Sequence, residues 1–132
     1  MLDLTHIQDN EGLRLKPYKC TANKTTIGYG RNLEDKGITE EEAMYLFLHD
    51  IQDCAAAAHE IFDDFGSYKA NVKTVIIDML YNLGSTRFCT FKKFIAAIKA
   101  GDLNEAAEQI RDSKYALQVP TRATKNINLL LR

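Results

Sequence analysis

Residues 10–33 read NEGLRLKPYKCTANKTTIGYGRNL, and this stretch sets the fold class because the rest of the chain has helical patterns. Apolar and basic residues alternate over LRLK (13–16), which is the two-residue period of a strand. Pro17 and the polar corner at 21–23 interrupt this strand, and TTIGYG (25–30) resumes it with β-branched residues and glycines. The sequence therefore predicts a small hairpin sheet of three short strands within about residues 12–37.

Helices are expected on both sides of this sheet. Residues 3–10 have room for two helical turns that end near Gly12. A long helix begins at Thr39, where Glu42 completes a capping box, and the apolar run VIIDMLYNL (75–83) belongs to a helix that stops at Gly84. Three further helices are predicted to start at caps formed by Thr90, Asp102 and Thr121. The predicted class is α+β and mostly α, with a small N-terminal β-hairpin lobe (about 12–37) joined to a larger helical bundle in a single domain, 1–132.

The composition limits the kinds of partner. The chain has 132 residues, of which 45% are hydrophobic, enough for one core. A net charge of -1 gives no attraction for nucleic acid or acidic membranes. The segment MLDLTHIQDNEG (1–12) lacks the basic start and apolar stretch of a signal peptide, and no apolar run approaches a membrane span. We expect a protein made in the cytoplasm, without direct membrane insertion.

The cysteines do not suggest a disulfide framework. Cys20, Cys54 and Cys89 are odd in number and far apart, which is typical of a reducing cytoplasm. Cys54 falls on the apolar face of the long helix and is expected in the core. His49, Cys54 and His59 are spaced by five residues, which distributes them around a helix, so no metal site is predicted.

Glu11 is the first candidate for chemistry. It stands between the expected helix and the first strand, beside Gly12, where its side chain can project into a cleft between the lobes. A desolvated carboxylic acid there could protonate a glycosidic oxygen, and a solvated carboxylate at a helix end is the alternative. A glycosidase commonly needs a second carboxylate, but the spacing does not choose among Asp9, Glu34 and Asp35.

Cys20 and Thr26 are the next candidates. Cys20 lies at a turn among polar residues, so its thiol either faces the same cleft as Glu11 or belongs to an inert turn residue. Lys19 favours the thiolate, whereas an ionised Glu11 opposes it. The Thr26 hydroxyl could hold a water molecule, although threonine also fits a plain strand position.

This constellation resembles the signature of the phage-type lysozymes, the muramidases of glycoside hydrolase family 24. In that signature a glutamate is followed after eight residues by aspartate or cysteine, and after five more by threonine, as are Glu11, Cys20 and Thr26 here. The resemblance continues through DMLYNLG (78–84), FKKFIAAIKAGD (91–102) and DSKYALQVPTRA (112–123), and so covers nearly the whole chain. It implies a lysozyme-like fold.

The resemblance also implies a substrate and residue roles. The family cleaves the β-1,4 bond between N-acetylmuramic acid and N-acetylglucosamine in bacterial peptidoglycan, without a cofactor or metal. Glu11 would be the general acid, while Cys20 and Thr26 would handle the water that attacks the anomeric carbon. Arg122 matches an arginine that pairs with the catalytic glutamate; an exposed arginine at a helix start is the alternative. The positions that match the lining of the sugar cleft are Asn32, Tyr81 and Phe94.

Two positions depart from the family's commoner pattern. Aspartate is more familiar at position 20, and a thiol with an ordinary pKa of about 8.5 is a poor base until it ionises. A covalent route through sulfur, or attack by the sugar's own 6-hydroxyl in a lytic transglycosylase reaction, therefore stays open beside hydrolysis. Tyr115 stands where tryptophan is common, and we expect it to fill most of the same volume.

The resemblance further implies an endolysin of a phage or prophage. It would be made in the host bacterial cytoplasm and reach the cell wall in the periplasm after a holin-type protein permeabilises the membrane. Its partners would be the glycan strands of peptidoglycan, and a monomer is the default. A catalytically inactive wall-binding relative is the chief rival, and a nucleic-acid module is disfavoured by the near-neutral charge.

Overall fold

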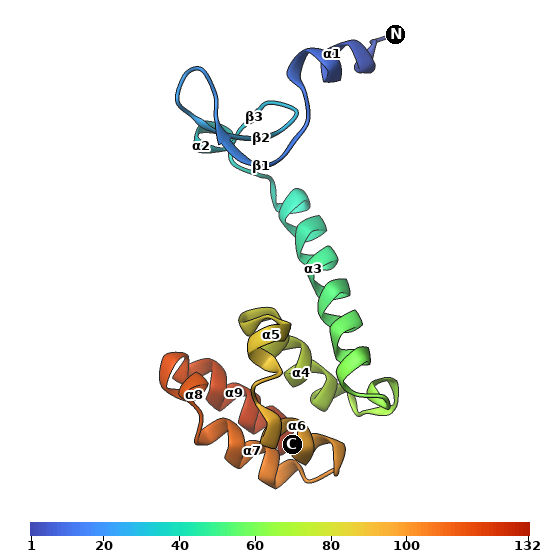
Figure 1. Cartoon of the computed structure of the whole chain (residues 1–132), viewed down its shortest axis with the longest axis vertical. Helices are drawn as coiled ribbons and strands as arrows, with labels where there is room; N and C mark the ends of the chain where they lie inside the picture. Colours follow the sequence, from blue (N-terminus) through green and yellow to red (C-terminus); the bar gives the residue numbers. More distant parts are fainter. The chain divides into compact units, whose positions relative to one another are not determined.

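The computed structural model describes all residues, 1–132, and its class is α+β with mostly helix, as predicted. The chain divides into two compact units, Met1–Leu46 and Phe47–Arg132. The sheet belongs to the first unit and most helices to the second, while helix α3 (Glu40–Ile61) contributes to both (Figure 1). The sheet spans residues 14–32, inside the range expected for the β-hairpin lobe; that both lobes form a single domain stays a prediction.

The first unit opens with helix α1 (Leu4–Glu11), close to the predicted range. The Asp3 side chain accepts a hydrogen bond from the His6 N–H at 3.1 Å, which satisfies one of the N–H groups left open at a helix start. At the other end the chain leaves the helix through Gly12, whose φ of 72° suits a residue without a side chain.

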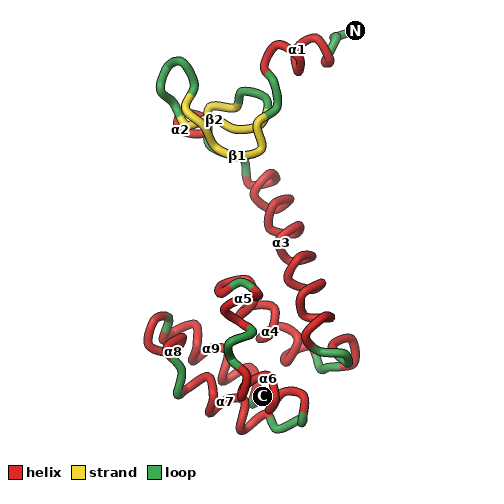
Figure 2. The backbone as a smooth tube through the Cα atoms, viewed as in Figure 1, coloured by secondary structure: helices red, strands yellow, loops and turns green.

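Three antiparallel strands follow in the order β1-β2-β3, drawn in yellow in Figure 2. They are β1 (Arg14–Lys19), β2 (Thr25–Gly28) and β3 (Arg31–Asn32). Tyr18 pairs with Thr26, and Thr26 pairs with Asn32, so these three residues share one row across the sheet. The β1–β2 register shifts between Arg14 and Tyr18, in the segment that contains Pro17, which has no N–H to donate to a partner strand.

Two helices close the first unit. Helix α2 (Leu33–Lys36) was not anticipated, because four residues are too few for a periodic pattern. The capping box that opens α3 is present as predicted: Glu42 N–H donates to the Thr39 hydroxyl oxygen at 3.1 Å, and Thr39 N–H donates to the Glu42 carboxylate at 2.9 Å. The Arg31 guanidinium also binds Glu42 at 2.6 Å, which ties β3 to the start of α3.

The second unit is helical throughout (Figure 1). After α3 it contains a short 3-10 helix (Phe65–Ser67), α4 (Ala70–Leu83), α5 (Ser85–Phe88), α6 (Lys92–Lys99), α7 (Leu103–Arg111), α8 (Lys114–Gln118) and α9 (Pro120–Leu130). Asp102 caps α7 by accepting from the Glu105 N–H at 3.1 Å, as predicted. None of the helices is both long and apolar enough to span a membrane.

Two predicted helix caps are wrong. The Thr90 hydroxyl donates to the Arg87 carbonyl at 2.6 Å, because the unforeseen helix α5 ends just before it, and Phe91 precedes α6. Helix α9 begins at Pro120 and not at Thr121. Proline at the first helical position has the right φ and loses no hydrogen bond, so Pro120 can start the helix itself.

The hydrophobic core belongs to the second unit. Its fully buried apolar side chains run from Ala58 to Leu130, and edge-to-face contacts join the rings of Phe62, Phe88 and Phe94. Tyr115 is 1% exposed within this core, and Cys54 packs against it, both as expected. No apolar side chain of the first unit is buried to this degree.

Candidate active site

Glu11 lies against the β2–β3 turn. It is the last residue of α1, and its carboxylate reaches the backbone of Gly30, where φ is 75°. A Cβ atom on Gly30 would stand 3.1 Å from the Glu11 carboxyl carbon and closer still to Oε2. The carboxylate therefore occupies the space that a side chain at position 30 would need.

Cys20 and Thr26 meet at the β1–β2 turn. Cys20 N–H donates to the Lys24 carbonyl at 3.0 Å, and Asn23 N–H donates to the Cys20 carbonyl at 2.8 Å. Asn23 has a φ of 61°, a left-handed conformation that asparagine tolerates well. Thr26 is 3% exposed, and its hydroxyl donates to the Lys24 carbonyl at 2.8 Å. The hairpin thus brings Cys20, which begins the turn, close to Thr26 in strand β2.

This turn favours negative charge at position 20. The backbone N–H of Lys24, then that of Ala22, and then the Thr26 hydroxyl lower the pKa of Cys20 by hydrogen bonding to its sulfur. A hydroxyl has one proton, so Thr26 supports the thiolate only when it turns away from the Lys24 carbonyl. The two backbone N–H groups are therefore the constant part of a small anion-binding concavity.

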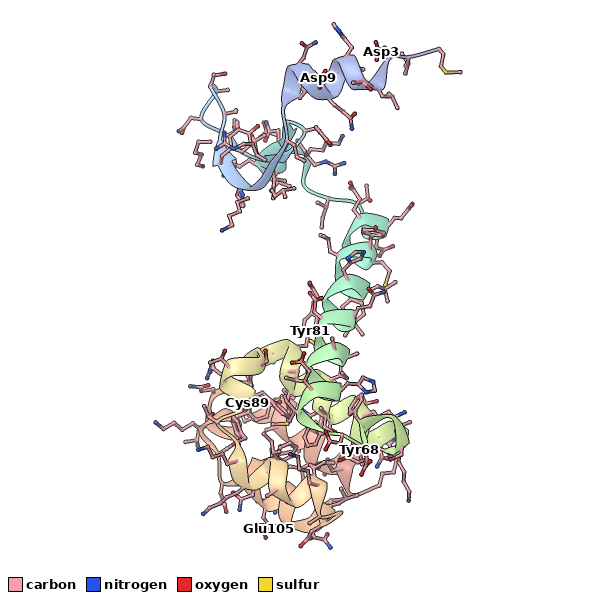
Figure 3. The ribbon with its side chains drawn as sticks, turned by 45° about the vertical axis from the view of Figure 1, so that its right-hand side comes forward. Asp3, Asp9, Tyr68, Tyr81, Cys89 and Glu105 are labelled. Atoms are coloured by element: carbon pink, nitrogen blue, oxygen red, sulfur yellow. The ribbon has the colours of Figure 1, made fainter.

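Two of the three carboxylates considered as partners of Glu11 hold the first unit together. Glu34 accepts hydrogen bonds at 2.9 Å from Lys19 Nζ and from the N–H and hydroxyl of Thr25. These bonds, the one from Lys19 first, lower the pKa of Glu34 to about 2. Asp35 binds Lys24 Nζ at 3.4 Å. Asp9 lies exposed on α1 (Figure 3).

Asn32, predicted to bind substrate, has a structural task as well. Its side-chain oxygen accepts from the Asp35 N–H at 3.1 Å and caps α2, and its Nδ2 donates to an Asp35 oxygen at 3.0 Å. Asn32 also pairs with Thr26 across the sheet, which puts it in the row that contains a predicted catalytic residue. Its contact with a glycan stays a prediction.

Arg122 belongs to a polar network in the second unit. Its guanidinium binds Asp78 in a two-pronged contact, with Nε to Oδ2 at 2.9 Å and Nη2 to Oδ1 at 2.8 Å. Asn126 donates to Asp78 at 2.9 Å and to the Tyr115 hydroxyl at 2.9 Å. Burial on its own would raise the pKa of Asp78, but the hydrogen bonds from Arg122 and Asn126 outweigh it and lower the pKa. Asp78 therefore stays ionised and fixes the plane of Arg122.

Tyr81 and Arg122 line a common pocket of about 480 Å³ within the second unit. The remaining lining comes mainly from apolar side chains of α3 and α4, with Lys73 and Asp78 as charged members. Tyr81, labelled on α4 in Figure 3, is 42% exposed and its ring centroid lies 5.7 Å from that of Phe47. A surface ring next to a guanidinium edge is suited to contact with a sugar face and its hydroxyls.

Phe94, the third predicted substrate contact, is 1% exposed in the core. It also borders a smaller pocket, of about 340 Å³, with Phe91, Lys92, Gln109 and Asp112 among its other lining residues. A ligand could meet Phe94 only from that pocket, and the role of Phe94 in substrate binding stays a prediction.

Two residues in these surroundings were missed from the sequence. Gly30 was noted only as part of a glycine-containing strand, although its partner Glu11 was singled out. Asp78 left a clearer signal, since it is the single acidic residue within VIIDMLYNL (75–83). No group of three or more His, Cys, Asp or Glu side chains is arranged to hold a metal ion.

Comparison with known proteins decides the family. The family model described as phage lysozyme matches residues 8–126, which include every candidate residue from Glu11 to Arg122. The chain belongs to the phage lysozyme family. It is also 31% identical, over 110 residues, to a protein named endolysin from Acyrthosiphon pisum secondary endosymbiont phage 1; the match covers 80% of this chain and 73% of that protein.

Membership of the phage lysozyme family fixes the class of reaction. The chain is a lysozyme-type glycoside hydrolase whose substrate is peptidoglycan. The first unit of this lysozyme holds Glu11, Cys20, Thr26 and Asn32, and the second holds Tyr81, Phe94 and Arg122. The pairing of Arg122 with Glu11 that the resemblance implies stays a prediction.

Proposed function

We propose that this lysozyme cleaves the β-1,4 bond between N-acetylmuramic acid and N-acetylglucosamine, with Glu11 as the general acid. The observation that carries the proposal is the position of the Glu11 carboxylate beside the backbone of Gly30, in a chain that belongs to the phage lysozyme family. The Glu11 carboxylate is exposed at the end of a helix and beside a turn, so substrate can reach it there. Glu11 protonates the glycosidic oxygen as the bond to the anomeric carbon breaks.

Cys20 and Thr26 handle the attacking water in this proposal. The backbone N–H groups of Lys24 and Ala22 stabilise the Cys20 thiolate, which accepts the proton that water loses as its oxygen bonds to the anomeric carbon. The Thr26 hydroxyl, held at the Lys24 carbonyl, orients that water. This assignment is supported by the anion-binding turn, which would serve a carboxylate at the same position equally well.

The remaining candidates position the substrate and the acid. Arg122 has its Nε and Nη2 committed to Asp78, so its positive charge is largely balanced. A balanced guanidinium can orient Glu11 without strongly favouring the ionised form, which would oppose proton donation. Sugar rings would contact Tyr81 and Asn32, and would reach Phe94 only through the pocket that it borders.

The name of the relative, endolysin, supports a proposal for the biological setting. We propose that the protein is made in the cytoplasm of a host bacterium and degrades its wall from the periplasm once a holin-type protein has permeabilised the membrane. It acts as a monomer on glycan strands, needs neither cofactor nor metal, and does not bind nucleic acid, in keeping with a net charge of -1.

The test is mass spectrometry of the products released from purified peptidoglycan by wild type and by Glu11→Gln. Reducing muramic acid ends from wild type alone would support hydrolysis with Glu11 as its acid. Anhydro-muramic ends would replace hydrolysis by lytic transglycosylation. Undiminished release by a folded Glu11→Gln variant would remove Glu11 from the mechanism. Release by neither protein, with the fold verified by circular dichroism, would favour an inactive wall-binding relative.

A further inference from the structure

We infer that Gly30 is a positioning residue for Glu11, and that the absence of a side chain at position 30 sets where the acid stands. The inference rests on the proposed role of Glu11. Gly30 itself has no group that could exchange a proton, so any effect on the reaction passes through its neighbour.

Two separate features of the structure favour glycine at position 30. Its φ of 75° is a conformation that side chains disfavour. In addition, the Glu11 carboxylate fills the position of the missing Cβ, with the carboxyl carbon at 3.1 Å and the Cβ of Glu11 at 3.7 Å. A methyl group at position 30 would push the flexible end of Glu11 aside, because the backbone of the turn is tied to β3 through the Ile27–Arg31 pair.

Gly37, in the same unit, allows the effect of backbone strain to be tested apart from the contact with Glu11. Gly37 also has a left-handed φ, of 64°, but a Cβ there would meet no atom within 4 Å. Gly37→Ala therefore introduces comparable backbone strain without touching Glu11. Gly37 is the residue that ends α2, which follows β3 in the chain, and it has no part in the proposed chemistry.

The displaced carboxylate has a specific kinetic consequence. A shift of about 1 Å in a reacting group can cost roughly 100-fold in rate. Because only the acid moves, the loss should appear in kcat, while KM and glycan affinity change by roughly twofold or less. A purely structural defect would lower the fraction of folded enzyme and leave the kcat of each folded molecule unchanged.

The experiment compares Gly30→Ala, Gly37→Ala and Glu11→Gln with wild type on purified peptidoglycan. We expect kcat to fall roughly 100-fold in Gly30→Ala and to stay near wild type in Gly37→Ala, with decreases of Tm in both and the larger decrease in Gly30→Ala, where the contact with Glu11 adds to the backbone strain. A kcat for Gly30→Ala within roughly twofold of Gly37→Ala would overturn the inference. If Glu11→Gln is inactive in the same assay, that result leaves the proposed function intact; an active Glu11→Gln overturns both.

Two further measurements separate displacement of Glu11 from a blocked sugar site and from backbone strain alone. Glu11→Gln and Glu11→Gln/Gly30→Ala should bind a soluble glycan-strand fragment equally well, and weaker binding by the double variant would mean that the methyl group blocks the sugar instead. Should Gly30→Ala prove unstable, Glu11→Ala/Gly30→Ala is expected to recover much of the lost Tm because the methyl then has room. If Gly30→Ala lowers Tm equally in the presence and in the absence of the Glu11 side chain, the contact with Glu11 is not the reason that position 30 is glycine, and the inference is overturned.

Discussion

Cys20 is the residue whose titration should shape the activity of this lysozyme. Hydrogen bonds from the Lys24 N–H, the Ala22 N–H and the Thr26 hydroxyl lower its pKa, so its thiolate forms at lower pH than that of an ordinary cysteine. The thiolate fraction rises with pH, and if the thiolate takes the proton from water, the contribution of Cys20 to kcat rises with it. A carboxylate at position 20 would already be ionised above pH of about 4.

The general acid is the same in wild type and Cys20→Asp, so we expect the ratio of the kcat of wild type to that of Cys20→Asp to rise from mildly acidic to alkaline pH, with Cys20→Asp keeping much of the activity. The measurement is a pH–rate profile of both proteins on purified peptidoglycan. Cys89→Ser, which alters an exposed cysteine of the second unit, is the control that should follow wild type (Figure 3). Coincident profiles for wild type and Cys20→Asp would exclude Cys20 as the base.

The cysteines should also differ in reactivity toward iodoacetamide. Burial, followed by the charges of Asp50 and Asp53, raises the pKa of Cys54, which packs against the core. Since the thiolate is the reactive form, Cys20 should be alkylated much faster than Cys54, and its alkylation should reduce the rate of wall degradation. Peptide mass mapping of the Cys89→Ser protein at timed intervals measures both rates. Equal labelling of Cys54, or full activity after complete labelling of Cys20, would contradict the assigned reactivities.

At the scale of elements, Glu42 joins strand β3 to the start of α3. It accepts hydrogen bonds from Arg31 at 2.6 Å and from the Thr39 N–H at 2.9 Å, and these, the one from Arg31 first, lower its pKa to about 2. A carboxyl group with a lowered folded-state pKa stabilises the fold above its unfolded pKa. That contribution is lost as the pH falls toward the folded value.

Glu42→Gln should therefore destabilise the protein at pH 7, and the difference from wild type should shrink between pH of about 4.5 and about 2. Urea unfolding at several pH values measures this difference. Glu41→Gln is the matched control, because Glu41 stands in the same first turn of α3 but is exposed and outside the capping box. A Glu42→Gln effect that is independent of pH, or equal to that of Glu41→Gln, would contradict the assigned role.

Elements held by local interactions were the ones predictable from the sequence. The Thr39–Glu42 box and the Asp102 cap each join residues three positions apart, so the local pattern contains both partners. The cap predicted at Thr90 failed because the short helix α5 ends just before it, and the cap predicted at Thr121 failed because α9 begins one residue earlier, at Pro120. The partners of Arg122 stand 44 residues away at Asp78, a contact that no local pattern encodes.

The same distinction applies to the candidate site. Spacing and family resemblance singled out Glu11, Cys20 and Thr26, and the tight turn at 20–24 explains how the last two meet. The position of the Glu11 side chain beside Gly30 could not be predicted, because it depends on the direction in which the chain leaves α1 at Gly12. Position 30 carries no side chain through which a sequence pattern could reveal the contact.

At the scale of the whole molecule, the proposed catalytic residues and the hydrophobic core lie in different units. The first unit carries Glu11, Cys20 and Thr26 but buries no apolar side chain, whereas the second contains the entire hydrophobic core. A segment of fewer than about 50 residues without a hydrophobic core rarely folds alone, because it buries too little surface to offset the entropy of folding. We infer that the second unit is the one that can fold by itself.

A fragment of residues 39–132 should therefore unfold cooperatively, since it keeps the complete core and the capping box that starts α3. Far-UV circular dichroism during urea unfolding measures this, and the fragment should show no lysozyme activity because it lacks Glu11. Ile110→Ala, at a fully buried position of α7, should cost about 2–5 kcal/mol in both the fragment and the full chain. A peptide of residues 1–38 should show no cooperative transition. A fragment 39–132 that unfolds gradually, or that is insensitive to Ile110→Ala, would show that its core depends on the first unit.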